Sequence, residues 1–187
     1  MIKNQIVWAK TLLAAYKYLG TMCNAIDRAV EKLAQNSFYS CGVWREENSI
    51  TNISKKIISL SNKKVDYINL KVVVEKAVKL LSEKGAKILI LKFIQGLDNK
   101  TIIQTLNMAD RTYYRKLNSA AQEFASKMTA IGYGVEKLDL IYGSDRFIKS
   151  IYDTISDVGQ CDVLNISTLK ETIFLESFIN SFSYGLA

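Results

Sequence analysis

Apolar residues recur at helical spacing along most of this chain. Near its start they alternate steps of three and four residues, the heptad pattern of a helix that packs along one face. We call these positions the N-terminal seam: Ala9, Leu12, Tyr16, Leu19, Cys23, Ile26, Val30 and Leu33. The seam predicts either a homodimer through a long N-terminal helix or packing within one chain. The intramolecular partners would be Ile50, Ile53, Ile57 and Leu60, or Leu70, Val74, Ala77 and Leu81.

The stretch from Leu80 to Met128 predicts three helices separated by residues that end or begin helices. A dense apolar run stops at Gln95-Gly96, where glycine supplies the left-handed conformation that closes a helix, so the first helix should end near Ile94. Asp98 or Asn99 can cap a short second helix, because either side chain accepts hydrogen bonds from free amides. The apolar positions of that helix are Ile102, Ile103 and Leu106.

Asn107 is predicted to form the tight turn between the second and third helices, because it tolerates a positive φ. Asp110 is the expected cap of the third helix. One face of this helix should be buried, since its apolar residues follow the helical period. They are Tyr113, Leu117, Ala120 and Phe124.

Polar residues suited to reading DNA occupy the opposite face of the third helix. They are Arg111, Arg115, Asn118 and Gln122. Arginine pairs with the edge of guanine, and asparagine or glutamine with that of adenine. The alternative is the ordinary solvated face of a surface helix. The preceding turn-linked helix and the basic character of the segment favour DNA contact, with Lys100 and Lys116 flanking the face and holding phosphates.

The same segment resembles the region 4 helix-turn-helix of sigma-70-type factors and, more closely, phage transcriptional regulators of the ArpU and RinA type. The resemblance is carried by Leu91-Lys92-Phe93, Gly96, Ile102, Leu106, Met108, Arg111-Thr112-Tyr113 and Leu117, with Arg-Thr-Tyr-Tyr-Arg opening the third helix. It implies a transcriptional regulator that binds double-stranded DNA, with Thr112 and Tyr114 in the binding set. Ile103, Ala109 and Lys100-Thr101 depart from the family pattern, which prefers a small residue, a capping serine and an acidic residue at these places.

Two other functions fit the same features. A sigma-like protein would use the motif region to contact RNA polymerase, and the small subunit of a phage DNA-packaging machine would combine the motif with oligomerising helices. A complete sigma factor is not expected, because the aromatic and basic cluster that melts a promoter is missing from the sequence.

The rest of the chain predicts further helices around this motif. Phe38 to Ser49 reads as a loop, and Ser61 to Lys64 as a second break. After Gly134 a short helix should bury Phe147, Ile148, Ile151, Tyr152 and Ile155 on one side. Thr168 and Glu171 form a capping-box pair before a last apolar helix. The expected domains are an N-terminal helical region at 1–62, the DNA-binding domain at 63–130 and a C-terminal helical extension at 131–187.

Composition narrows the function classes. The 187 residues include no proline and no clear strand pattern, which predicts an all-α fold. A net charge of +7 suits a partner that carries phosphates. Histidine is absent, and the three cysteines lack metal-binding spacing, so we expect no enzyme, no metal site and no cofactor. The amphipathic start lacks the apolar core of a signal peptide or membrane span, so we expect a cytoplasmic protein without a membrane partner.

Overall fold

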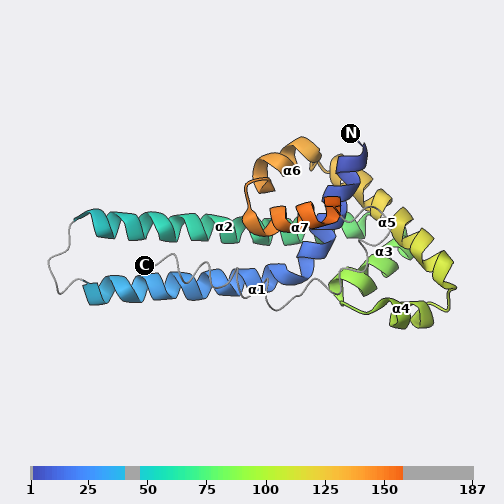
Figure 1. The fold of residues 1–187 in the computed structure, drawn as a ribbon, viewed down its shortest axis with the longest axis horizontal. Helices are drawn as coiled ribbons and strands as arrows, with labels where there is room; N and C mark the ends of the chain where they lie inside the picture. The colour runs from blue at the N-terminus through green and yellow to red at the C-terminus, as the bar shows by residue number, and fades with distance from the viewer. Residues whose placement is uncertain (1, 41–46, 158–187) are drawn as a thin grey trace. The chain divides into compact units, whose positions relative to one another are not determined.

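The computed structural model describes residues 2–40 and 47–157, and within these ranges all regular structure is helical (Figure 1). The elements are α1 (Ile2–Ser40), α2 (Glu47–Lys79), α3 (Glu83–Leu89), the π-helix η1 (Ile90–Ile94), α4 (Asn99–Thr105), α5 (Asp110–Ala130), α6 (Val135–Tyr142) and α7 (Arg146–Asp157). The described residues contain no strand. The prediction of an all-α fold is therefore confirmed.

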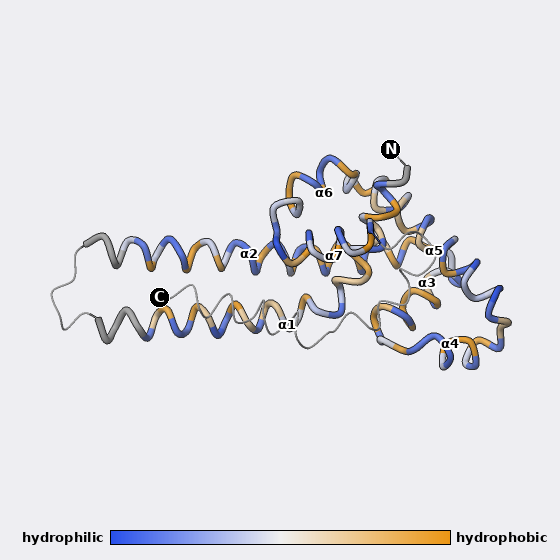
Figure 2. Tube along the Cα trace, viewed as in Figure 1, coloured by the Kyte–Doolittle hydropathy of each residue, from blue (hydrophilic) through white to orange (hydrophobic). Residues whose placement is uncertain are grey.

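Hydrophobic and hydrophilic residues alternate along the helices instead of forming long apolar runs (Figure 2). This alternation leaves each helix with a face for the core and a face for water. Among the described residues, no helix is both long and apolar enough to cross a membrane.

The described residues divide into two compact units whose boundaries fall inside α1 and α2. The smaller unit, within 18–70, is a helical hairpin built from the later part of α1 and the earlier part of α2. Leu19, Ile26 and Leu70 are fully buried, and the Lys64 ammonium donates to the Asp27 carboxylate at 2.6 Å. Apolar packing and an exposed ion pair thus hold this hairpin together.

The N-terminal seam is buried by packing within the chain. Leu12, Leu19 and Ile26 each have 0% of their surface exposed. The structure therefore follows the intramolecular alternative, and the seam leaves no apolar area at these positions for a second copy. A homodimer through the N-terminal helix would need a different surface. Cys23, which is also a seam position, is only partly buried.

Two predicted interruptions differ from the structure. Ser61 to Lys64 lies inside the continuous helix α2, so the boundary expected between 62 and 63 is not a break. Serine, asparagine and lysine cost less than about 0.7 kcal/mol each in a helix, which packing of Tyr67 and Leu70 overrides. The predicted loop at Phe38 to Ser49 is also too long, because α1 continues through Ser40 and α2 begins at Glu47.

The larger unit, within 2–17 and 71–157, joins the start of α1 to α3 through α7. Trp8 anchors this arrangement: it is fully buried, its indole donates to Asp139 Oδ1 at 3.0 Å, and its ring lies 4.7 Å from that of Tyr152. The expected helix after Gly134 is α7, with Phe147, Ile148, Ile151 and Ile155 buried and Tyr152 partly exposed.

Helix α6 is not predicted by the sequence pattern, because its eight residues are too few to show a clear apolar period. Helices α6 and α7 share a compact unit with α3 to α5, so residues 135–157 are not an independent extension. The capping-box pair at Thr168 and Glu171, and the apolar helix predicted after it, lie outside the described residues.

Candidate nucleic-acid interface

The first helix of the predicted motif ends where the sequence indicated. The π-helix η1 closes at Ile94, and Gly96 has φ of +71°, a conformation that glycine adopts without strain. Asp98 then caps α4, accepting from the Thr101 backbone amide at 3.2 Å and from the Thr101 hydroxyl. The hydroxyl bond and the backbone bond lower the pKa of the Asp98 carboxyl. The cap is therefore strongest when this carboxyl is ionised.

The turn between α4 and α5 also follows the prediction at Asn107, which has φ of +46°. The predicted cap at Asp110 is wrong. Ala109 occupies the N-cap position, where its carbonyl accepts from the amides of Thr112 and Tyr113 at 2.9 and 3.0 Å. Asp110 is the first residue of α5. Its negative charge therefore interacts favourably with the positive end of the helix dipole, but its side chain does not cap the helix.

The buried face of α5 is the one expected from its periodicity. Tyr113, Leu117, Ala120 and Phe124 are buried, together with Ala121, Ala125 and Met128. Helix α3 packs on this face and comes close at Gly85, where an added Cβ would lie 3.6 Å from Ala120 Cβ. Small residues at 85 and 120 thus permit the close helix approach. Ile103, on α4, is partly buried.

A carboxylate of α5 also caps α3. Glu123 accepts from the Ser82 backbone amide at 2.8 Å and from the Ser82 hydroxyl at 2.9 Å. These bonds satisfy a free amide at the start of α3 and tie that helix to α5. The position of α5 therefore depends on polar contacts as well as on its apolar face.

The opposite side of α5 presents the predicted polar residues to solvent. Arg111, Arg115 and Asn118 are exposed, as is Lys100 on α4, while Thr112 and Lys116 are partly buried. From Arg111 to Asn118 the helix rises about 10 Å. A major groove about 12 Å wide can receive a helix presenting such a stripe. We call Arg111, Arg115 and Asn118 the outer stripe.

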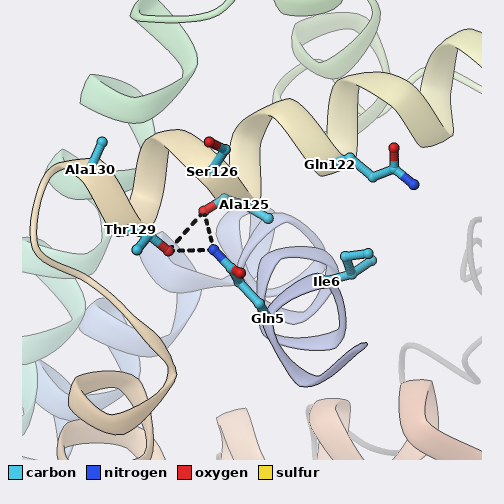
Figure 3. A pocket seen from close by; sticks show the side chains of 7 residues that line it. All are labelled: Gln5, Ile6, Gln122, Ala125, Ser126, Thr129 and Ala130. Atoms are coloured by element: carbon cyan, nitrogen blue, oxygen red, sulfur yellow. Dashed lines mark hydrogen bonds between the residues drawn. The ribbon is translucent and has the colours of Figure 1, made fainter. Parts of the chain in front are cut away.

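Gln122 continues the outer stripe but lies beside another helix. It lines an open groove of about 590 Å³ with Gln5 and Ile6 of α1 (Figure 3). The Gln5 amide donates to the Ala125 carbonyl at 3.1 Å and to the Thr129 hydroxyl. The start of α1 therefore lies beside the later half of α5, and Gln122 itself remains exposed.

The start of α4 is joined to α5 by two phenol groups. Tyr113 is fully buried, and its hydroxyl donates to Asn99 Oδ1 at 3.0 Å. Asn99 Nδ2 donates to the Tyr114 hydroxyl at 3.3 Å, and the two tyrosine rings meet edge to face at 5.1 Å. Tyr114 is 37% exposed. The sequence pattern indicates Asn99 only as a helix cap, because its bonds to α5 depend on tertiary packing.

Charge and donor chemistry at this surface suit a polyanion. The cations Lys100, Arg111, Arg115 and Lys116 outnumber the nearby carboxylates of Asp98 and Asp110. Across the described residues, no group of three or more cysteine or acidic side chains could hold a metal ion.

A comparison with known proteins found no match: no family model, curated protein or solved structure matches the chain.

Proposed function

We propose that α4, its turn and α5 form a helix-turn-helix that binds double-stranded DNA, with α5 entering the major groove. The observation that supports this most is the division of α5 into two faces. Its apolar side is buried against α3, while the outer stripe presents two guanidinium groups and one amide to solvent. Those groups can read base edges through bidentate hydrogen bonds.

Within this proposal each side chain has a distinct role. Arg111, Arg115 and Asn118 contact bases or the adjacent phosphates, and Lys100 and Lys116 hold phosphates on either side. Thr112 and Tyr114 supply hydroxyl donors at the edge of the stripe. Gln122 contributes least, because α1 lies beside it.

The cellular role proposed for this binding is transcriptional regulation in a phage or prophage. It rests on the resemblance of the motif to regulators of the ArpU and RinA type. RNA polymerase contact by a sigma-like protein is the competing role, and it predicts weak DNA binding by the isolated protein.

The test measures binding of purified protein to the DNA upstream of its own gene, and to a mixed-sequence duplex, across a salt series. Arg115→Ala should weaken binding to the preferred sequence by about 1 to 3 kcal/mol and relax selectivity at one base pair. Lys100→Ala should weaken binding to both duplexes and flatten the salt dependence by about one unit.

Arg28→Ala is the matched control, because it removes an exposed arginine from α1, outside the α4–α5 region. It should bind like the parent protein. Equal binding by Arg115→Ala and the parent, or the absence of salt-dependent binding, would contradict the proposal. Tight RNA polymerase binding without DNA binding would favour the sigma-like role.

A further inference from the structure

Asn99 is placed to control a neighbouring residue of the proposed DNA surface. It lies at the first position of α4, and its side-chain amide contacts the hydroxyls of both Tyr113 and Tyr114 on α5. One amide therefore links the two helices through consecutive tyrosines. Of the two rings, only that of Tyr114 reaches solvent.

The direction of these hydrogen bonds determines which further hydrogen bond the Tyr114 hydroxyl can form. Tyr113 donates its hydrogen to the Asn99 carbonyl, so the Asn99 N–H is left to donate to Tyr114. A phenol oxygen that accepts a bond keeps its own hydrogen for another acceptor. Burial also raises the pKa of Tyr113 to about 12, so Tyr113 remains a donor at neutral pH.

The position of Tyr114 on α5 indicates which DNA group this hydrogen would meet. Tyr114 follows Arg111 by three residues, which places it about 60° from that side chain around the helix, on the side bonded to α4. In helix-turn-helix complexes the first helix crosses the DNA backbone while the second reads bases. The Tyr114 hydroxyl therefore faces the expected path of the phosphates.

We propose that Asn99 is a positioning residue that holds Tyr114 so that its hydroxyl donates to a DNA phosphate. This inference rests on the proposed DNA binding of α5. The contact is neutral and independent of sequence, so it should add affinity for any duplex. It should not change the salt dependence, because no cation is lost when the hydroxyl is removed.

The test uses the full-length chain and two fluorescent 30-base-pair duplexes of unrelated mixed sequence. Tyr114→Phe should weaken binding to both duplexes by about 3- to 10-fold, the range for one hydrogen bond. Its salt slope should match the parent's. Tyr133→Phe is the control, since it removes a partly exposed phenol hydroxyl from outside α4 and α5.

A double-mutant cycle separates positioning from general damage to the fold. Asn99→Ala should weaken binding in the parent but have little further effect in the Tyr114→Phe background. An equal effect in both backgrounds would overturn the positioning role. Loss on only one duplex would overturn the phosphate assignment.

The parent protein distinguishes failure of this inference from failure of the proposed function. If the parent binds neither duplex, DNA binding itself is refuted. If the parent binds both and Tyr114→Phe binds equally well, only the Asn99–Tyr114 inference is overturned. Thermal unfolding of each variant checks that α4 and α5 remain folded.

Discussion

Replacing Glu123 with alanine should destabilise the contact between α5 and α3. The carboxylate accepts two hydrogen bonds from Ser82, at 2.8 and 2.9 Å, and so serves as a cap supplied from another helix. Losing a helix cap costs about 0.5 to 2 kcal/mol. Alanine regains at most about 0.5 kcal/mol through its higher helix propensity. The net loss should therefore be about 1 kcal/mol in the free energy of unfolding.

Urea unfolding followed by circular dichroism measures this loss. The midpoint should fall while the slope stays constant, because the surface exposed on unfolding is almost unchanged. The thermal midpoint should fall by about 2 to 4 °C for a chain of this size. Glu31→Ala, at an exposed position of α1, is the control and should change stability little.

A cycle with Ser82→Ala tests whether the loss arises from the cap. The alanine at 82 removes the hydroxyl bond but keeps the backbone amide bond, so it should cost less than Glu123→Ala. The two losses should not add, since the variants remove a shared interaction. Full additivity, or a Glu123→Ala protein as stable as the parent, would refute the capping role.

Three further changes test the packing and the titrating groups. Phe124→Ala should cost about 3 to 5 kcal/mol in unfolding free energy, because a fully buried ring leaves a cavity; a loss below 1 kcal/mol would contradict its place in the core. Asp98→Ala should lower the protection of the Thr101 amide against hydrogen exchange, taken as the ratio of the intrinsic to the observed rate, and acidification that protonates Asp98 should lower this ratio in the parent; an unchanged ratio would argue against the cap. Burial raises the pKa of Tyr113 to about 12, so the stability that this neutral phenol provides is present below pH 10 and is lost as pH rises toward 12. The thermal midpoint of Tyr113→Phe should decline less over that range than the parent's, and equal declines would count against this account.

Local signals explain why the α4–α5 region could be predicted from sequence. Gly96 and Asn107 adopt positive φ, and Asp98 caps α4, because these properties belong to the residues themselves. The predicted cap of α5 is wrong by one position, because Asp110 is a favoured capping residue and directly follows the actual N-cap, Ala109. A local pattern does not distinguish helix starts that differ by one residue. Ala109 occupies the N-cap position without a side-chain hydrogen bond.

Sequence by itself determined the helical class and the two faces of α5, because a period of 3.6 residues separates Tyr113 and Leu117 from Arg111 and Arg115. Tertiary structure alone decided which surfaces meet. It placed the N-terminal seam in contact with its own chain, brought the start of α1 beside Gln122 of α5, and joined Asn99 to Tyr113 and Tyr114. The physical reason is that periodicity identifies an apolar face but not the face it packs against. Several helices present similar apolar faces, so only long-range packing decides which two meet.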